Sequence, residues 1–407
     1  MKILYIDQYF STREGISGDR TYEFARILVR RGHRVTVITS DSEYAGRERK
    51  QKRRFAWRTQ SVDGIRVLIL PVGYSSRMGY LRRAAAFATF MILGTVAALF
   101  SEKHDVVYAT STPLTVGIPG FCASRLRGSR FVFEVRDLWP EAPIQLSVIR
   151  NAVLIRCLRG LEKFFYRKAD LIVPLSEGMK RGVLDTGVQA AKCVTIPNAC
   201  DTDLFTGIDT NEIRKSLDVG DRILCVYAGA VGPANDLRYL LDVAKKVEET
   251  EPDGWLFLVV GDGPQRSLLE AQASRSGSPV RFIGPFSRKK AAEYIAAADM
   301  TLTLFKDLEV LGTNSPNKLF DSLAAGKPVL VNSRGWTRDL VETERAGCFL
   351  PPDDPARAAH VLMELRASPD RIRQMGENAG RLARDVFDRA KLADRLEQAL
   401  VSVAKGK

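Results

Sequence analysis

The chain has 407 residues, 45% of them hydrophobic and 27% charged, which excludes a disordered protein and predicts two domains rather than one. Its formal net charge of +13 predicts an anionic partner, for which nucleic acid, anionic lipid and phosphorylated substrates are the usual classes. Six cysteines without a C-x-x-C pair indicate reduced thiols of a cytosolic protein, and three scattered histidines argue against a histidine-based metal site.

Short runs rich in Val and Ile alternate with helical segments along the first half of the chain. The first strand, residues 2–7, starts without a leader, so we expect no signal peptide. A helical stretch follows at 20–32, and further strands are expected at 34–40, 65–72, 105–111, 130–137, 170–176 and 193–198. Because these runs are apolar on both faces, they are typical of buried parallel strands.

One segment of the first half, residues 84–100, contains no charge and is at the short limit for crossing a bilayer, which needs ~20 apolar residues. Arg77, Arg82 and Arg83 precede it, and the basic run 47–54 lies further upstream with Trp57. Three interpretations stay open. The segment is a transmembrane helix, a buried core helix, or a helix in a membrane surface, which its basic and aromatic neighbours favour.

A second series of strands and helices begins after the polar, turn-rich segment 196–213. Its strands are expected at 222–229, 255–263, 280–285, 300–305 and 327–333, before a helical tail. We therefore predict an α/β protein with two doubly wound Rossmann-like domains, residues 1–200 and 201–385, and a C-terminal helix, 386–407, that packs back on the first domain. Ligands of such folds bind beyond the carboxyl ends of the strands, so we expect the site in a cleft that the two domains face.

Glycines follow several of the predicted strands. In this position a glycine lets the backbone approach a ligand closely, and the N-terminus of the next helix favours negative charge. The first loop lacks the G-x-G-x-x-G pattern, which disfavours a nicotinamide-binding domain. A tight turn without a ligand is the alternative for each of them. The candidate donor-binding glycines are Gly15, Gly18, Gly229, Gly232, Gly261 and Gly263.

The segment "FEVRDLWPEAP" ends a strand of the first domain with charges of both signs. We expect Asp137 to position a sugar or acceptor hydroxyl, with Glu141 as a second candidate and Arg136 as a nearby cation. The alternative is a local ion pair beside a packed Trp139.

The segment "NSPNKLFDSLAAGKPVL" combines a helix start with a cation. Asn314 or Ser315 would cap the helix and Pro316 would occupy its first position. The backbone N–H groups near the start and the Lys318 ammonium would then hold a diphosphate. Asp321, one turn further, could accept the hydroxyls of a ribose. A capped helix with a solvent-facing lysine is the alternative; the candidate residues are Ser315, Pro316, Asn317, Lys318, Leu319 and Asp321.

The order of these motifs resembles the retaining family-4 glycosyltransferases of the GT-B fold. The resemblance rests on "GISGDRTYEFARILVRRGHRVTVIT", "IPNACDTDLF", "YAGAVGP", "VVGDGP", "VRFIGPF" and "KLFDSLAAGKPVL", in that order over most of the chain. The phrase "EVRDLWPE" resembles the branch that adds N-acetylated aminosugars such as fucosamine to lipid-linked bacterial surface glycans.

This resemblance implies a metal-independent transferase without a cofactor. Its donor would be a nucleoside-diphosphate sugar, UDP-linked, and its acceptor a polyprenyl-diphosphate-linked glycan of O-antigen, capsule or exopolysaccharide synthesis. Lys318, Asp137, Arg136 and Glu141 would then be the catalytic candidates. The protein would be cytoplasmic and peripheral on the anionic inner face of the cell membrane, and would not bind nucleic acid.

The chain departs from the family pattern at the diphosphate. The family's Arg and Lys that contact the diphosphate correspond to Ala230 and Asn235 in this chain. Its paired glutamates correspond to Thr313 and Asp321, and a histidine that is frequent in the family corresponds to Arg136. Lys318 and backbone amides would then carry the charge, helped by Arg136 or Arg20.

Three other functions remain open from the sequence. They are a sugar-nucleotide epimerase of related shape, a non-catalytic partner in glycan assembly, and a nucleic-acid-binding protein, although no aromatic-studded basic sheet or recognition helix is apparent. The "DTD" at 201–203 resembles a metal motif of another glycosyltransferase fold, but its place in the linker indicates a turn.

Overall fold

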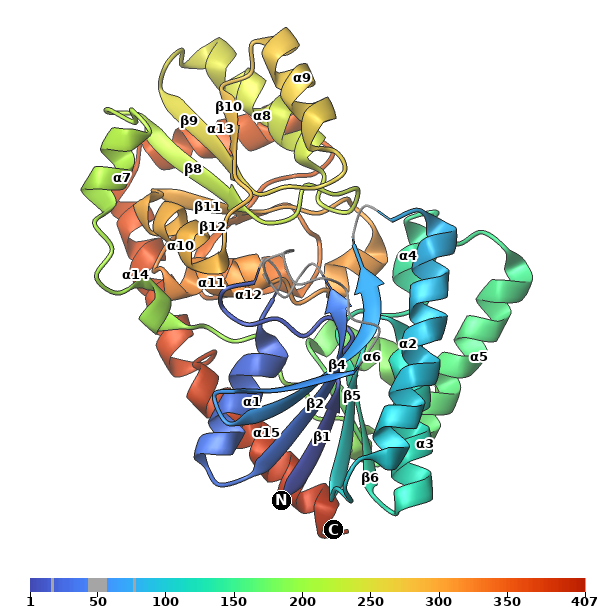
Figure 1. Cartoon of the computed structure of the whole chain (residues 1–407). Helices are drawn as coiled ribbons and strands as arrows, with labels where there is room; N and C mark the ends of the chain where they lie inside the picture. The colour runs from blue at the N-terminus through green and yellow to red at the C-terminus, as the bar shows by residue number, and fades with distance from the viewer. Residues whose placement is uncertain (16–17, 43–56, 76–77, 407) are drawn as a thin grey trace. The chain divides into compact units, whose positions relative to one another are not determined.

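The computed structural model describes residues 1–15, 18–42, 57–75 and 78–406. They form two compact units, residues 1–197 with 389–407 (unit 1) and residues 198–388 (unit 2). Each unit has a sheet, parallel in unit 2 and parallel apart from one edge strand in unit 1, that is covered by helices on both faces, as expected for the predicted fold class (Figure 1). The basic run 47–54 and Arg77 lie outside the described residues.

Among the described residues, unit 1 has a seven-stranded sheet in the order β3-β4-β2-β1-β5-β6-β7. Helices α1 and α15 lie on one side of it and α2, α3 and α5 on the other (Figure 1). The strands are β1 (Lys2–Ile6), β2 (Arg34–Ser42), β3 (Arg58–Val62), β4 (Ile65–Tyr74), β5 (Val106–Thr110), β6 (Arg130–Val135) and β7 (Leu171–Pro174). The helices are α1 (Arg20–Arg30), α2 (Tyr80–Phe100), α3 (Gly117–Arg127), α4 (Glu141–Gln145), α5 (Ala152–Lys168), α6 (Glu177–Leu184) and α15 (Arg389–Ala404).

The unit 2 sheet, all of whose residues are described, has six strands in the order β10-β9-β8-β11-β12-β13. Its strands are β8 (Ile223–Ala228), β9 (Trp255–Val260), β10 (Val280–Ile283), β11 (Met300–Thr303), β12 (Val329–Val331) and β13 (Gly347–Phe349). Its helices are α7 (Thr210–Ser216), α8 (Leu237–Thr250), α9 (Arg266–Ser276), α10 (Arg288–Ala297), α11 (Asn317–Ala324), α12 (Trp336–Thr343), α13 (Pro355–Arg366) and α14 (Pro369–Asp385).

Successive residues of β8 show why unit 2 has helices on both faces of its sheet. Cys225 and Tyr227 pack in one buried cluster with residues of α8 and α13. Leu224 and Val226 point the other way, into a second cluster with residues of α10. Side chains alternate along a strand, so a strand that is apolar at every position must be covered twice.

Two strand predictions differ from the structure. Residues 193–198 do not form a strand, because Cys193 makes only an isolated bridge to Ile172. The antiparallel edge strand β3 was not predicted, because its sequence RTQSV is polar and largely exposed and lacks an apolar run. At the C-terminus, α15 packs against α1, and Arg31 pairs with Glu397 at 2.6 Å.

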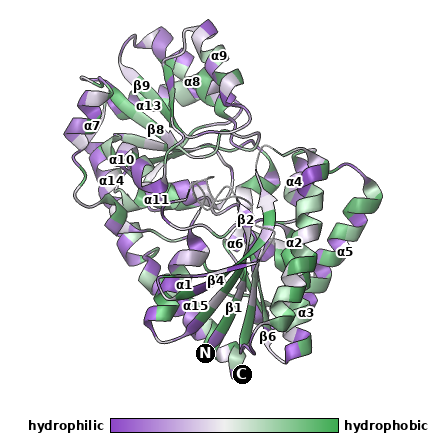
Figure 2. Cartoon of the chain, viewed as in Figure 1, coloured by the Kyte–Doolittle hydropathy of each residue, from purple (hydrophilic) through white to green (hydrophobic). Residues whose placement is uncertain are grey.

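Helix α2 extends the apolar segment 84–100 back to Tyr80. It is the one helix of the described residues that is long and apolar enough to cross a membrane. Only 28% of its most apolar window is buried, so the interpretation as a buried core helix is wrong. Figure 2 shows the apolar colouring of this helix.

Candidate functional site

The ammonium group of Lys318 lies beside the loop that follows β8. It donates hydrogen bonds to the Tyr227 hydroxyl at 2.7 Å and to the Asn235 side-chain oxygen at 2.9 Å. It also lies 4.2 Å from the centre of the Tyr227 ring and 5.1 Å from that of Phe305. No described carboxylate is close enough to form an ion pair with Lys318, and burial lowers the pKa of its ammonium to about 7. Lys318 is therefore a cation held by neutral groups.

Gly229 gives the Lys318 side chain its space. Its φ of +154° is unfavourable for other residues, and a Cβ there would lie 3.3 Å from the Lys318 Cε. Gly261 and Gly263 have to be glycines for a different reason. A Cβ on Gly261 would lie 1.9 Å from the Gly229 backbone oxygen, and a Cβ on Gly263 would lie 2.3 Å from the Val231 backbone oxygen. These two glycines let two strand-end loops pack backbone to backbone, which shapes the surface around Lys318.

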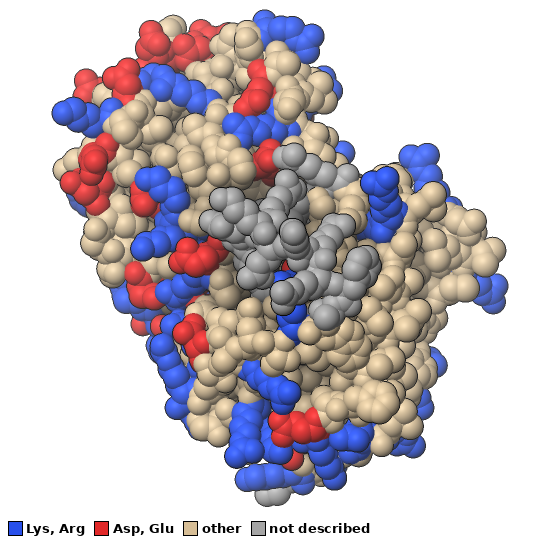
Figure 3. Space-filling view, viewed as in Figure 1, with Lys and Arg blue, Asp and Glu red and all other residues tan. Residues whose placement is uncertain are grey.

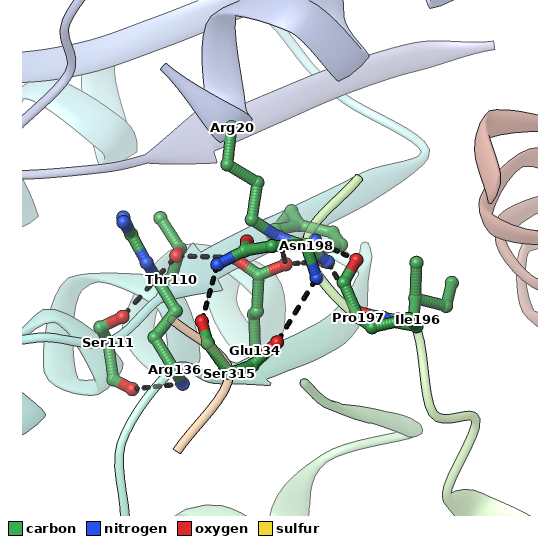
Figure 4. Close-up of polar contacts among 10 residues, drawn as sticks. Arg20, Thr110, Ser111, Glu134, Arg136, Ile196, Pro197, Asn198 and Ser315 are labelled. Carbon is green, nitrogen blue, oxygen red and sulfur yellow. Dashed lines mark hydrogen bonds and ion pairs between the residues drawn. The ribbon is translucent and has the colours of Figure 1, made fainter. Parts of the chain in front are cut away.

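The start of α11 differs from the predicted cap. The helix begins at Asn317 with Pro316 as N-cap and without a side-chain cap hydrogen bond. The Ser315 hydroxyl oxygen instead accepts from the Asn198 amide at 3.3 Å, and the Ser315 carbonyl accepts from the Asn198 side chain at 2.7 Å (Figure 4). The prediction of Asn314 or Ser315 as N-cap is thus wrong, because Ser315 is used by a neighbouring segment.

The first-turn amides of α11 are not equivalent. The backbone N–H groups of Asn317 and Lys318 have no hydrogen-bond partner among the residues that the structure describes. The N–H of Leu319 donates to the Pro316 carbonyl, and the Leu319 side chain is fully buried in the core. Two amides and one ammonium group therefore form the potential anion-binding set.

Asp321 is held by an arginine. The Arg288 guanidinium lies 2.6 Å from the Asp321 carboxylate and 2.9 Å from that of Asp201. Asp201 is the first acid of the "DTD" sequence, so its carboxylate ties the linker to α10. A metal cluster of His, Cys, Asp or Glu is not found within the described part of the chain.

In unit 1, a buried network lies at the ends of β5 and β6 (Figure 4). The Glu134 carboxylate accepts hydrogen bonds from Arg20 at 2.8 Å, Thr110 at 2.6 Å and Tyr108 at 2.7 Å. Arg20 also donates to the carbonyls of Ile196 and Pro197 at 2.8 and 2.6 Å. The expectation that Arg20 assists at a diphosphate is therefore wrong, because its guanidinium is buried in structural contacts.

Arg136 and Asp137 follow this network at the carboxyl end of β6. Burial raises the pKa of Asp137 to about 6, although the Arg136 charge opposes this shift. Asp7, at the end of β1, is a further buried carboxyl whose pKa is raised by burial and lowered in part by Arg136. Sequence reasoning overlooked Asp7, although an acid after the apolar run "KILYI" is a signal for this edge of the sheet.

Gln8, which follows Asp7, was also overlooked. Its side chain is fully buried, and neither its amide nitrogen nor its oxygen has a hydrogen-bond partner within the described residues. Buried amide groups rarely remain unpaired, so Gln8 is a candidate for ligand contact beside Asp7.

The remaining predicted residues lie elsewhere in their units. Glu141, in the first turn of α4, forms a partly exposed ion pair with Arg159 at 2.7 Å. Gly15 is buried in the loop after β1, and Gly18 precedes α1. Gly232 would tolerate a Cβ, whose nearest neighbour would be Asn235 at 3.8 Å.

Comparison with known sequences identifies both units. Residues 17–199 match the family model "Glycosyl transferase 4-like domain" and residues 222–368 match "Glycosyl transferases group 1". The chain is 27% identical over 221 residues, 52% of this chain and 53% of the relative, to TuaH of Bacillus subtilis (strain 168), a glycosyltransferase assigned to teichuronic acid biosynthesis. It is 30% identical over 179 residues, 40% of this chain and 39% of the relative, to the D-inositol 3-phosphate glycosyltransferase of Thermomonospora curvata. The chain spans about half the length or less of these curated relatives.

Solved structures agree with the fold along the whole chain. Sucrose-phosphate synthase of Thermosynechococcus elongatus has a TM-score of 0.78 at 16% identity and covers 100% of both chains. HepE of Anabaena in complex with UDP has a TM-score of 0.69 at 20% identity, over 99% of this chain and 100% of that one. With a family match in each unit and this fold, the chain belongs to the glycosyltransferases of the GT-B fold.

Proposed function

We propose that the protein transfers a sugar from a nucleoside-diphosphate donor, UDP-linked, to an acceptor hydroxyl with retention of the anomeric configuration. The observation that carries this proposal is the position of the Lys318 ammonium group, which has no acidic partner among the described residues and lies at the start of α11. HepE, a structural neighbour, was solved with UDP and with UDP-glucose, which supports a UDP-linked donor.

Lys318 and the amides of Asn317 and Lys318 would hold the leaving diphosphate. Negative charge grows on the diphosphate as its bond to the sugar breaks, so donors fixed beforehand stabilise the transition state more than the ground state. Removing one such donor typically raises the barrier by ~2.7–4 kcal/mol. The Tyr227 hydroxyl and the Asn235 oxygen fix the ammonium before the donor arrives.

Asp321 is the proposed ligand of the ribose hydroxyls. An ionised carboxylate offers several acceptor positions, so a contact with Arg288 is compatible with further hydrogen bonds. In this proposal Arg288 fixes the direction of the carboxylate, and Asp201 fixes Arg288.

On unit 1, Asp137 would position the acceptor hydroxyl and Arg136 would offset the charge of phosphate groups. The proposed acceptor is a polyprenyl-diphosphate-linked glycan, and the proposed sugar is an N-acetylated aminosugar. TuaH is described as a putative glycosyltransferase of teichuronic acid biosynthesis, which supports a role in polysaccharide assembly. We also propose that the protein is cytoplasmic and peripheral on the inner face of the cell membrane.

A thermal-shift panel of nucleoside diphosphates tests the donor site. We expect UDP to raise the melting temperature of the wild type more than other nucleoside diphosphates, and to lose most of this effect with Lys318→Ala. A wild type that no nucleoside diphosphate stabilises would refute the proposal.

A non-catalytic partner in glycan assembly is a second candidate, favoured by Asn235, which is neutral where the resemblance implies a lysine. That function predicts UDP binding without donor hydrolysis or transfer. An epimerase would instead convert the donor sugar without an acceptor, which mass spectrometry and NMR of the reaction mixture would reveal.

A further inference from the structure

Helix α2 has two apolar faces, of which the fold covers only one. Ala86, Phe90, Gly94, Ala97 and Ala98 are buried, and a Cβ on Gly94 would lie 3.8 Å from Pro119 of α3. This face packs on β4 and α3. A helix on the surface of a soluble domain normally presents polar side chains on its other face.

The other face of α2 is apolar and exposed. Its large side chains follow helical spacing, with exposures of 88% for Leu81, 58% for Ile92, 38% for Val96 and 86% for Phe100. Contiguous exposed apolar surface of this kind marks a binding surface in a protein that is otherwise folded.

The exposed stripe continues on the two neighbouring helices. Helix α3 lies between α2 and α5 and exposes Leu126 at 70%. Helix α5 exposes Val153 at 72%, Leu154 at 47% and Phe164 at 37%. The three helices form one layer on the same side of the sheet (Figures 1 and 2). We call the exposed apolar surface of this layer the α2–α3–α5 face.

The charges of this face have one sign. Arg82 and Arg83 lie at the start of α2, Arg125 and Arg127 at the end of α3, and α5 ends with Arg167 and Lys168. The acidic residue of the three helices is Glu162. It is buried and accepts a hydrogen bond from Tyr166 at 3.0 Å, and burial raises the pKa of its carboxyl to about 7. Accordingly, the region over α2 and α5 in Figure 3 is blue and tan.

A cavity of about 620 Å³ adjoins the end of this face. It lies at the amino ends of β5 and β6, and its lining has four basic side chains, of Lys103, Arg125, Arg130 and Lys168, and two acidic ones, of Asp105 and Asp170. Arg130 pairs with Asp170 at 3.2 Å, which leaves the other three cations without an ion pair in the described residues. Such a cavity suits phosphate groups.

We propose that the α2–α3–α5 face docks on an anionic phospholipid bilayer, with the apolar side chains of α2 and α5 inserted among the headgroups and the basic cavity holding lipid phosphates. Charge complementarity selects this partner, because exposed apolar groups among cations are what binding to an anionic membrane surface requires. The helix lies in the plane of the membrane rather than across it, because α2 keeps its inner face packed on β4 and α3. This inference rests on the proposed function only for which membrane is bound, namely the inner face of the cell membrane.

Sedimentation of the full chain with vesicles tests the surface. We expect binding to vesicles of phosphatidylcholine with 30% phosphatidylglycerol, weaker binding as salt rises, and little binding to phosphatidylcholine alone. Alkaline carbonate should release the bound protein, whereas resistance to carbonate would overturn docking in the plane.

Two sets of variants separate the apolar and charged contributions. Ile92→Ser with Val96→Ser and Phe100→Ser should reduce vesicle affinity at least tenfold, and Arg125→Glu with Lys168→Glu should reduce both the affinity and its salt dependence. The controls are Leu268→Ser, which is 57% exposed on α9, and Lys245→Glu on α8. Equal binding by the variants and these controls, or a wild type that ignores anionic vesicles, would overturn the proposal.

UDP stabilisation measured without lipid separates this surface from the donor site. We expect all of these variants to keep it. If the wild type is stabilised by UDP but does not bind vesicles, the docking surface and the proposed membrane location are overturned and the donor site is not. If the wild type binds vesicles but is not stabilised by UDP, the proposed transferase function is overturned and the docking surface is not.

Discussion

Lys318 donates a hydrogen bond of 2.9 Å to the side-chain oxygen of Asn235, 83 positions earlier in the chain. The resemblance to family-4 glycosyltransferases implies a lysine at residue 235, where this chain has a neutral asparagine. This asparagine directly contacts Lys318, the cation that we propose as the replacement for the family's lysine. Two lysines at this distance would repel each other in a partly buried site. The absence of a cation at residue 235 and the presence of one at residue 318 are therefore physically linked.

Substitution of Lys318 by alanine should leave the fold intact and lower turnover by about 10²–10³-fold. The reason is the loss of one fixed donor to the leaving diphosphate, while α11 and its core contacts remain. Steady-state transfer assays with circular dichroism as a folding control measure this. Turnover near that of the wild type would contradict the role of Lys318.

Moving the cation should restore part of the function. We expect Asn235→Lys in the Lys318→Ala background to recover UDP affinity relative to Lys318→Ala alone, because the ammonium returns to the same neighbourhood. In the wild-type background the same Asn235→Lys change should lower the melting temperature, since it places two ammonium groups together. Calorimetric titration with UDP gives the affinities, and an unimproved double variant would refute the replacement.

Donor affinity should fall as the pH rises above 7. Burial lowers the pKa of Lys318 to about 7, so free protein loses the positive charge above this pH, and the dissociation constant should rise by up to about tenfold per pH unit. A nucleoside-diphosphate sugar is the suitable probe, because its diphosphate does not titrate in this range. Lys318→Arg stays charged and should give a flat profile; a flat wild-type profile would contradict the prediction.

Stability should show the opposite pH dependence at the same residue. The pKa of Lys318 is lower in the folded than in the unfolded chain, so the unfolded chain binds more protons between about pH 7 and 10.5. In this window, Lys318 therefore makes the free energy of unfolding of the ligand-free protein increase with pH. Lys318→Met should remove this contribution; chemical denaturation of both proteins at several pH values measures it.

Asp137→Asn should raise stability at pH 7.5 and lower turnover. Burial raises the pKa of Asp137 to about 6, so the folded chain binds more protons than the unfolded chain between about pH 4 and 6. This contribution to stability decreases as the pH rises through that window, and asparagine avoids the cost of burying the charge. Asp370→Asn, which is 88% exposed in its side chain, is the control. A less stable Asp137→Asn protein would refute this account.

Glu134→Ala should destabilise unit 1 strongly. It leaves the Arg20 guanidinium, which is 2% exposed, without its carboxylate, and breaking a buried pair in this way costs about 3–5 kcal/mol. The matched control is Glu102→Ala, which removes a pair with Lys2 that is 39% exposed on each side and is worth at most about 1 kcal/mol. Urea denaturation of both variants gives the comparison, and similar midpoints would contradict a stabilising role of the Arg20–Glu134 pair.

The positions of the sheets could be predicted because each strand carries its own signal. Runs such as residues 222–229 and 255–263 are apolar at successive positions, which indicates burial on both faces without any tertiary information. The edge strand β3 carries no such signal, since backbone pairing with β4 and not side-chain burial holds it in place.

The candidate site could be predicted only in part. Lys318 follows from the pattern of a proline and a lysine at a helix start, whereas the cap at Ser315 does not, because its hydroxyl is taken by Asn198, 117 positions away. The glycines were expected to approach a ligand, but Gly261 and Gly263 are required by contacts with the backbone at Gly229 and Val231.

The sequence by itself determined two α/β domains, the glycines after their strands and the lysine at the start of α11, because these follow from local periodicity and local helix chemistry. Tertiary structure alone decided that Arg20 is a buried partner of Glu134, that Lys318 rests on Tyr227 and Asn235, and that α2 keeps one apolar face uncovered. Each of these depends on which distant residues surround a side chain, and burial and charge pairing arise only when those residues meet.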